Sequence, residues 1–300
     1  MHLFLVRHGE TEHNVAGLLA GVSDSRLTNH GVLQTQRLGS HLVNHRNLHF
    51  SHIYASDLQR AFMTAEEIRK AQASILTECT ANPDVVKLQL LREQDFGSLE
   101  LVPWASRRAQ VAFTPESSSM EDLDFRPQET AEAMAHRAEC FLSDHILPLL
   151  AATPAEISAG VQDCVAVVSH GLFLSVLWRS LLSKFDVDRV RINSKTEITT
   201  NGRPLAYLPN WSNTGFLELR IGSPSDIVPN PISALESSSP EADGSRPLAS
   251  QLLTILAINS KDHLLNLKRT RGGVGSAPFD ARQKSLEGFF KRPKQCADPS

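Results

Sequence analysis

The first 222 residues alternate between short apolar runs and longer stretches in which apolar residues recur every three or four positions. Residues 2–6 and 165–168 are almost continuously apolar, which is typical of strands buried on both faces of a parallel sheet. Three further apolar runs predict strands, at 52–55, 85–91 and 216–221.

The stretches between these runs predict amphipathic helices. In one of them, apolar residues follow the i, i+3, i+4, i+7 spacing that places them on one helical face: Leu58, Ala61, Phe62, Ala65 and Ile68. Either Ser56 or Asp57 is expected to cap this helix, and Thr28 to cap an earlier one over 28–44. Two more helices are expected, at 129–150 and 172–182. Because strands alternate with helices, we expect an α/β fold with three layers, α/β/α, and a mostly parallel sheet.

The composition changes after Gly222. Residues 222–251 contain eight serines and five prolines, and a segment with so few apolar groups cannot offset the entropy that ordering would cost. We therefore expect a main domain over 1–222, a disordered Ser/Pro-rich linker over 223–251 and a C-terminal tail over 252–300. Within this tail, residues 252–258 are apolar again and could form a short strand or a helix.

The charge is spread unevenly along the chain. The formal net charge is −3, with 30 Lys and Arg against 33 Asp and Glu, so the molecule as a whole is not a polycation built to bind nucleic acid. Residues 261–300, however, hold nine basic and four acidic residues. A basic tail that follows an acidic body suggests that the tail has a task of its own.

The four cysteines form no C-x-x-C pair, so the sequence indicates neither a zinc site nor a disulfide framework. No signal peptide is expected, because the apolar run 3–6 stops at Arg7. The longest uncharged stretch, between Asp163 and Arg179, is too short to span a bilayer. These features predict a soluble protein of a reducing compartment, the cytoplasm or the nucleus or both, without contact to a membrane.

Three polar segments follow expected strands: residues 7–11, 56–60 and 169–171. In an open parallel sheet, ligands bind beyond the carboxyl ends of the strands, so these segments can converge on one site. They would bring two histidines and two arginines together. So much positive charge is costly unless an anion lies between these side chains.

These segments carry a resemblance to a known family. Residues 7–11, Arg-His-Gly-Glu-Thr, with Asn14 soon after, are similar to the signature of the histidine phosphatase superfamily, whose fold is that of phosphoglycerate mutase. The similarity continues at Asp24, Leu27, Thr28 and Gly31, and in residues 55–61, 91–97 and 168–171. It spans roughly residues 1–222. Four segments in the family's order are far more specific than an isolated Arg-His-Gly.

The resemblance implies a reaction centred on His8. A neutral imidazole is a good nucleophile toward phosphorus, so His8 would attack in line and become a phosphohistidine. Arg7 and Arg60 would bind the phosphoryl oxygens, since their forked donors match that geometry. No metal and no other cofactor is expected to take part.

The remaining roles also follow from the resemblance. His170 would share the charge of the transferring group, and Asn14 would add an amide donor. Glu93 is the candidate general acid, which would protonate the leaving oxygen and then deprotonate the attacking water. Glu10 and Glu100 lie nearby in the sequence and are the alternatives to Glu93.

Some positions depart from the family's pattern. Arg26 stands where a proline is common, and Leu101 where a glycine often follows Glu100. The segment 101–126 carries no readable substrate signature. Within it, Arg107 and Arg108 could hold a second anionic group or could simply be solvated.

The tail carries a second motif. Gln283, Leu286, Phe289 and Phe290 resemble the PIP box, a peptide that binds the DNA sliding clamp. In one helical turn the three apolar residues share a face, and the glutamine can hydrogen-bond to a polar pocket. The alternatives are an accidental match, or docking of both phenylalanines on the protein's own domain. Basic residues in 268–271 and 291–294 could also serve as a nuclear import signal.

The sequence therefore predicts a metal-independent phosphomonoester phosphatase, similar to acid phosphatases of the histidine type, that acts on a small phosphorylated molecule or a phosphoprotein through phospho-His8. One alternative is a mutase of the phosphoglycerate mutase type, which returns the phosphoryl group to a hydroxyl of the substrate. Another is an adaptor that docks on the sliding clamp through its tail and has a weakly active domain.

Overall fold

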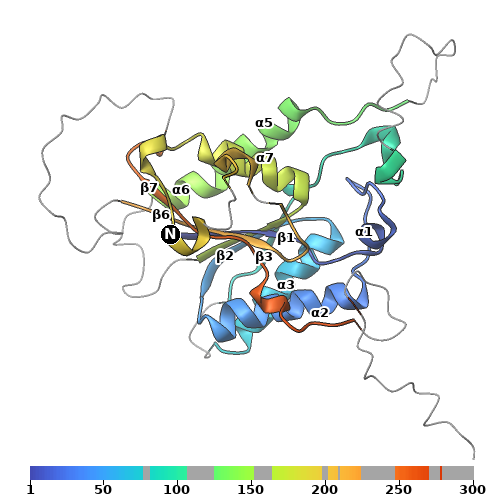
Figure 1. The fold of residues 1–300 in the computed structure, drawn as a ribbon, viewed down its shortest axis with the longest axis horizontal. Coiled ribbons are helices and arrows are strands. Elements are labelled where there is room, and N and C mark those ends of the chain that lie inside the picture. Colours follow the sequence, from blue (N-terminus) through green and yellow to red (C-terminus); the bar gives the residue numbers. More distant parts are fainter. Residues whose placement is uncertain are drawn as a thin grey trace, which may run out of the picture.

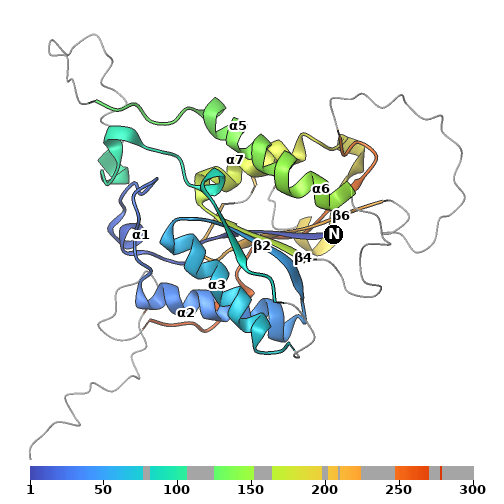
Figure 2. The ribbon, with the colours of Figure 1, turned by 180° about the vertical axis from the view of Figure 1, so that it is seen from behind.

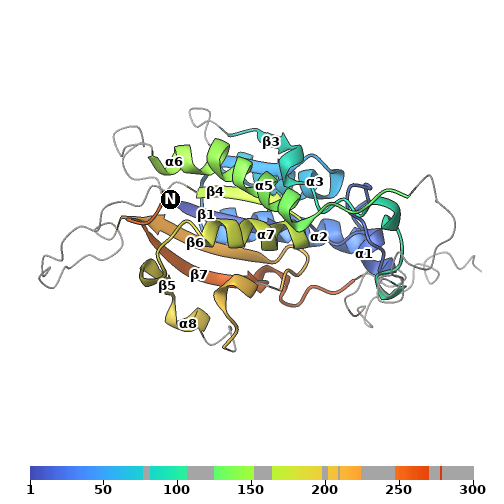
Figure 3. The ribbon, with the colours of Figure 1, turned by 90° about the horizontal axis from the view of Figure 1, so that it is seen from above.

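The computed structural model describes residues 1–76, 82–106, 125–151, 164–197, 202–208, 210–223, 247–269 and 278. Within them, seven strands form one sheet in the order β3-β2-β4-β1-β6-β7-β5 (Figures 1 and 3). The strands are β1 (His2–Arg7), β2 (Phe50–Ser56), β3 (Val85–Leu88), β4 (Cys164–Ser169), β5 (Val190–Ile192), β6 (Phe216–Gly222) and β7 (Leu252–Ser260).

Parallel pairing predominates, as the sequence predicts. The pairs β3–β2, β2–β4, β4–β1 and β5–β7 are parallel, whereas β6 runs antiparallel to both β1 and β7. The two most apolar runs of the sequence, β1 and β4, lie side by side in the middle of the sheet, and all of β4 is buried. A strand covered on both faces has no polar face to offer, which explains their continuous hydrophobicity.

Helices cover both faces of the sheet and give the expected three layers (Figures 1 and 2). On one face lie α2 (Asn29–Ser40) and α3 (Gln59–Ala73), and on the other α5 (Ala131–Phe141), α6 (Leu147–Ala151) and α7 (Gly171–Leu182). The described residues also form two short helices, α1 (Glu12–Ala16) and α8 (Ser194–Glu197). The core is correspondingly split into two buried clusters, one on each side of the sheet.

Single turns of other helix types fill several connections. Segments of π-helix continue α2 over His41–His45 and join α5 to α6 over Leu142–Ile146. Turns of 3-10 helix occur at Gln89–Leu91, Gly97–Leu99, Trp104–Ser106, Val187–Arg189, Leu205–Tyr207 and Asp262–Leu264. The long helix expected over 129–150 is thus a run of three consecutive segments.

One of the two expected helix caps is confirmed and the other is wrong. The Thr28 side chain accepts a hydrogen bond from the Gly31 N–H and caps α2. At α3 the N-cap is Leu58, which makes no side-chain cap bond. Asp57 instead forms an ion pair with Arg92, whose Nη2 lies 2.6 Å from Oδ2. The competing charge partner, far away in the sequence, explains why Asp57 is not a cap.

The segment 252–260, which lies within the expected tail, belongs to the sheet. It forms β7, which is hydrogen-bonded to β6 on one side and to β5 on the other (Figure 3). Leu253 and Ile255 are buried in the core. Most of the expected linker, residues 224–246, and the PIP-box-like residues Gln283, Leu286, Phe289 and Phe290 lie outside the described residues, as do Arg107 and Arg108. Among the described helices, none combines the length and the apolar character that crossing a membrane requires.

Candidate active site

The register between β1 and β4 brings two histidines together. The last residues of these parallel strands, Arg7 and Ser169, are paired, and each is followed directly by a histidine. The ring centroids of His8 and His170 lie 5.1 Å apart, with the planes inclined by 58°. The convergence expected from the sequence is therefore present at the carboxyl edge of the sheet.

A hydrogen bond at Nδ1 of His8 leaves the other ring nitrogen, Nε2, unprotonated. His8 is buried, and its Nδ1 lies 2.7 Å from the carbonyl oxygen of Gly9. Because a carbonyl can only accept, Nδ1 carries the proton and Nε2 keeps its lone pair. Burial, reinforced by the positive charges of Arg60 and Arg7, holds the pKa of His8 well below its usual value. At neutral pH this side chain is an uncharged imidazole, the form that can attack phosphorus.

His170 has the opposite arrangement of protons. Arg60 Nε donates to its Nδ1 over 3.2 Å, so the proton of the neutral ring resides on Nε2. This Nε2 is buried and has no hydrogen-bond partner within the described chain. Burial and the neighbouring charge of Arg60 hold the pKa of His170 well below its usual value. The site thus pairs an imidazole that offers a lone pair with one that offers an N–H group.

Most donors of Arg60 are directed at protein atoms. The side chain is only 1% exposed, and it donates to the carbonyls of Ser23 (2.8 Å), Gly21 (2.7 Å) and Ala20 (3.1 Å) in addition to His170. From the sequence, the fork of Arg60 was expected to face phosphoryl oxygens. In the structure the guanidinium lines the cavity but is engaged mainly in holding the 20–23 loop and His170.

Arg7 and Asn14 keep donors free for an anion. Arg7 Nη1 donates to the Trp211 carbonyl over 2.7 Å, while its buried Nε has no partner within the described residues. Burial lowers the pKa of Arg7, and the charge of Glu93 opposes this shift. The Asn14 side-chain oxygen accepts from the Thr11 N–H and from Asn213. Its Nδ2 amide is therefore the group left to donate.

Glu93 is held at the start of α7. Its carboxylate accepts hydrogen bonds from three backbone N–H groups: Gln94 (3.0 Å), Leu172 (3.0 Å) and Phe173 (2.9 Å). Of the three candidate acids, only Glu93 lines the cavity that His8 and Arg7 line. The carboxylate of Glu10 accepts from Thr28, and that of Glu100 from the 21–23 backbone.

The cavity has a volume of about 310 Å³. Its lining includes Arg7, His8, Asn14, Arg60 and Glu93, and it also includes residues that the sequence analysis did not single out, among them Phe96, Trp104, Ser175, Asn210 and Trp211. Asn213 is another such residue, since it donates to the His8 carbonyl and to Asn14. For Asn210, Trp211 and Asn213 the signal in the sequence was the polar, tryptophan-containing stretch directly before β6.

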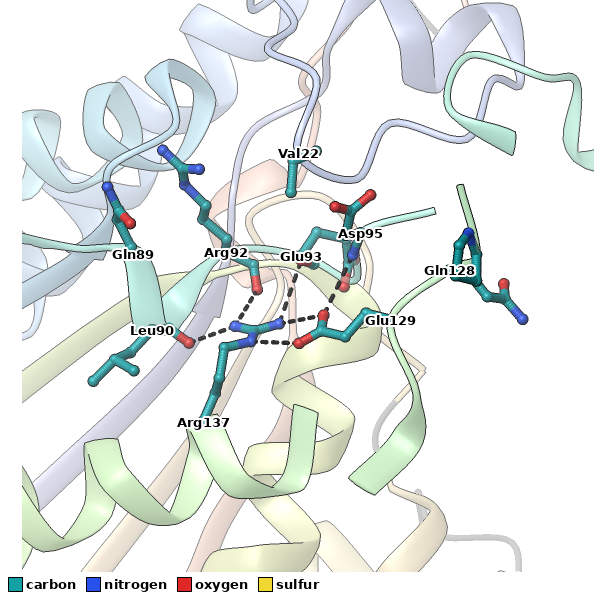
Figure 4. Close-up of a pocket in the computed structure, with 10 residues that line it drawn as sticks. Val22, Gln89, Leu90, Arg92, Glu93, Asp95, Gln128, Glu129 and Arg137 are labelled. Carbon is teal, nitrogen blue, oxygen red and sulfur yellow. Dashed lines mark hydrogen bonds and ion pairs between the residues drawn. The ribbon is translucent and has the colours of Figure 1, made fainter. Parts of the chain in front are cut away.

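A second cavity, of about 530 Å³, is also lined by Glu93 (Figure 4). Here Arg137 forms a two-point ion pair with Glu129 and donates to the carbonyls of Leu90 and Arg92. Its guanidinium also lies 4.6 Å from the ring centroid of Phe173, at the start of α7. Arg137 therefore fixes the segment that carries Glu93 to the helix that holds the Glu93 carboxylate.

Comparison with known proteins agrees with this geometry. The family model of the histidine phosphatase superfamily (branch 1) matches residues 3–200, about two thirds of the chain. The chain belongs to the histidine phosphatase superfamily. The resemblance given by the residue segments is thereby confirmed, and this histidine phosphatase is a phosphohydrolase or mutase similar to phosphoglycerate mutases.

Curated relatives of this histidine phosphatase include several phosphatases and mutases. Probable phosphatase C1620.13 of Schizosaccharomyces pombe is 30% identical over 289 residues, which cover 96% of this chain and 79% of the relative. Probable phosphoglycerate mutase GpmB of Proteus mirabilis is 34% identical over 190 residues, 61% of this chain and 75% of the relative. Fructose-2,6-bisphosphatase TIGAR B of Danio rerio is 31% identical over 203 residues, 60% and 74% of the two chains.

Solved structures share the fold of this histidine phosphatase. A protein described as mycobacterial hydrolase 1 superposes with a TM-score of 0.56 at 21% identity, covering 86% of this chain and 98% of its own. A mycobacterial glucosyl-3-phosphoglycerate phosphatase in complex with VO3 gives a TM-score of 0.50 at 22% identity, covering 73% and 92%. At these identities the similarity establishes the α/β architecture.

Proposed function

We propose that this protein is a phosphomonoester phosphatase that works through a phosphohistidine on His8 and needs no metal. The proposal rests above all on the two imidazoles with opposite protons, because His8 Nε2 can attack while His170 Nε2–H donates to the phosphoryl group. Arg7 and Asn14 add donors to the same cavity.

The reaction has two steps. His8 Nε2 forms a bond to phosphorus as the ester P–O bond breaks, and Glu93 gives its proton to the leaving oxygen. Glu93 then takes a proton from water, whose oxygen attacks phosphorus and breaks the N–P bond. Inorganic phosphate leaves and the imidazole is restored. His170, Arg7 and Asn14 stabilise the transferring group in both steps by hydrogen bonding.

The test is hydrolysis of p-nitrophenyl phosphate in the presence of a chelator. The wild-type protein should retain its activity, and His8→Ala should lose it by roughly 10⁴-fold or more because no nucleophile remains. Brief incubation with labelled substrate should trap an acid-labile phosphoprotein in the wild type alone. Full activity of His8→Ala, or inhibition by the chelator, would contradict the proposal.

The mutase alternative is distinguished by its product. A mutase returns the phosphoryl group to the substrate, so phosphoglycerate would yield its isomer, whereas a phosphatase releases free phosphate. We expect free phosphate as the main product.

We also propose, from the sequence motif, that the tail binds the sliding clamp through Gln283, Leu286, Phe289 and Phe290. Calorimetric titration of the full chain with the clamp should show binding that Phe289→Ala/Phe290→Ala abolishes. Equal binding by both proteins, or no binding by either, would exclude this role. The double variant should keep its phosphatase activity, which separates the adaptor function from the enzyme.

A further inference from the structure

One face of α7 leads away from the phosphoryl site. Leu172, Ser175, Val176 and Arg179 follow the i, i+3, i+4, i+7 spacing of a single helical stripe. Leu172 and Ser175 line the catalytic cavity, and all four line a neighbouring cavity of about 330 Å³. The two cavities share Leu172, Ser175 and Asn210 in their linings, so they lie next to each other, and we call the pair the groove.

The far end of this groove carries one positive charge. Arg179 is the only charged residue among the described residues that line it, and no carboxylate faces it. Within the described chain the Arg179 guanidinium has no hydrogen bond or ion pair. Tyr207 also lines this cavity, is 69% exposed, and belongs to a turn anchored by the 2.7 Å bond from Trp178 Nε1 to the Leu205 carbonyl. This lining suits a ligand that carries an anionic group on an apolar or sugar-like body.

We propose that Arg179 binds a second anionic group of the substrate, while the phosphoryl group to be removed lies at His8. This proposal rests on the phosphatase function proposed above. The seven residue steps from Leu172 to Arg179 span about 10 Å of helix axis. The substrate is thus a phosphomonoester long enough to carry a phosphate or carboxylate that far away, such as a hexose bisphosphate. A three-carbon phosphoester acid is too short.

The experiment compares two substrates in three proteins. Arg179→Ala should lower kcat/KM for a hexose 1,6-bisphosphate by roughly tenfold or more, mainly through KM, because a charge-assisted hydrogen bond is lost. Its activity on p-nitrophenyl phosphate should stay within twofold of the wild type. Arg191→Ala, which removes an exposed arginine from β5, should change neither substrate's kinetics.

Binding provides a readout that does not depend on turnover. In a His8→Ala background, hexose 1,6-bisphosphate should bind more tightly than the 6-monophosphate, and Arg179→Ala should remove the difference. Equal affinities for the two ligands, or a difference that survives Arg179→Ala, would overturn the subsite. A wild-type protein that leaves p-nitrophenyl phosphate intact would contradict the phosphatase function instead, and the binding comparison would still decide on Arg179.

Glu100 lies outside the catalytic cavity, since it is not one of the described residues that line it. Its carboxylate accepts from three successive N–H groups, those of Gly21 (3.2 Å), Val22 (3.1 Å) and Ser23 (3.1 Å), and from the Phe96 N–H (3.0 Å). Successive N–H groups of this kind form a concave anion site. Burial would raise the pKa of Glu100, but these hydrogen bonds outweigh it and lower the pKa.

The same loop faces Arg60 with its carbonyl groups. The carbonyls of Gly21 and Ser23 accept from the guanidinium, whose Nε donates to His170 Nδ1. The loop is closely packed, since a Cβ atom on Gly21 would collide with the Gln94 carbonyl and with Glu100. Glu100, the loop, Arg60 and His170 therefore form one continuous series of contacts.

We infer that Glu100 is a positioning residue that fixes the tautomer of His170 through this series. Glu100→Gln replaces one acceptor oxygen by an NH₂ group, which cannot accept from the loop N–H groups. We expect kcat to fall by roughly tenfold with KM within twofold, since the Nε2–H donor is needed most in the transition state. The ¹⁵N spectrum of His170 should show loss of the single Nε2–H tautomer.

Two variants serve as controls. Glu132→Gln changes an exposed carboxylate on α5 and should leave kcat and the spectrum unchanged. Glu100→Asp keeps both acceptor oxygens and should recover part of the lost kcat. A wild-type tautomer of His170 in Glu100→Gln, or Glu100→Asp no better than Glu100→Gln, would overturn the inference, and a melting curve of each variant shows that the fold is retained.

Discussion

The two histidines of the pocket occupy similar places and are controlled in different ways. Each is the first residue after a central strand, and each is neutral at pH 7. His8 is oriented by the carbonyl of its own neighbour, Gly9, so its tautomer depends on local backbone alone. His170 is oriented by Arg60, which lies 110 residues away in the sequence and is itself held by a loop.

This difference shows where the site is sensitive. A strand that forms in the correct register therefore supplies a nucleophile in the correct tautomer, although burial, Arg60 and Arg7 also help to keep it uncharged. The hydrogen-bond donor at His170 requires several long-range contacts to be correct at once. Substitutions distant from the pocket should therefore affect the donor and spare the nucleophile.

Among the variants that test the difference between His8 and His170, Arg60→Lys should have the largest effect on kcat. A lysine cannot bond to three loop carbonyls and to His170 together, because it lacks the planar fork. We expect kcat for p-nitrophenyl phosphate to fall by about 10²–10³-fold, as for loss of a transition-state donor. The phosphohistidine on His8 should still form slowly and be trapped. Complete absence of the intermediate would show that Arg60 also controls the nucleophile.

Glu93→Gln removes the proposed general acid, which protonates the leaving oxygen. Without an acid, hydrolysis of an alkyl phosphate should slow by roughly 10²-fold, because its alkoxide is a poor leaving group. An aryl phosphate, whose phenolate leaves easily, should slow much less in the phosphorylation step. Rapid-quench measurement of phosphoenzyme formation with both substrates gives the two values. Equal losses on the two esters would argue against Glu93 as the acid.

The pH dependence sharpens the comparison further. The pKa of His8 is lowered by burial and by Arg60 and Arg7, so the imidazole stays unprotonated as the pH falls through 6.5. The acid limb of kcat/KM, corrected for the second ionisation of the substrate, should therefore lie below pH 6.5. An acid limb at the value of a free histidine would show that His8 is not desolvated in solution.

The smallest expected effect concerns a histidine outside the pocket. Burial, with His41 and Arg37 nearby, lowers the pKa of His263 to about 3. The unfolded chain then binds the proton more readily, so stability is lost as the pH falls from 6.5 toward 3. In His263→Gln, the free energy of unfolding should fall with decreasing pH by about 1.4 kcal/mol per pH unit less than in the wild type. Urea unfolding at several pH values measures this slope. An unchanged slope would show that His263 is solvated.

Much of this arrangement was predictable from patterning. The continuous hydrophobicity of 2–6 and 165–168 located the two central strands, and the polar residues directly after them located the pocket. The role of Arg60 was predicted less well, because a sequence shows that a guanidinium is present but not that the carbonyls of Ala20, Gly21 and Ser23 surround it. Glu100 was considered as an acid, whereas its partners are backbone N–H groups that no residue type reveals.

The sheet position of β7 was also beyond the sequence. Its apolar run is short, follows a Ser/Pro-rich stretch and fits a strand or a helix equally well. Only pairing with β6 and β5 decides between them, and such pairing depends on tertiary contacts rather than on local preference.

The antiparallel course of β6 has a practical consequence. Arg220 is paired with His2, at the beginning of β1, and Gly222 is paired with Leu252. The chain thus leaves β6 and re-enters β7 at the sheet border opposite the two imidazoles. A fluorescent label or an immobilisation handle inserted between Gly222 and Leu252 would be anchored away from the pocket mouth and should leave turnover intact.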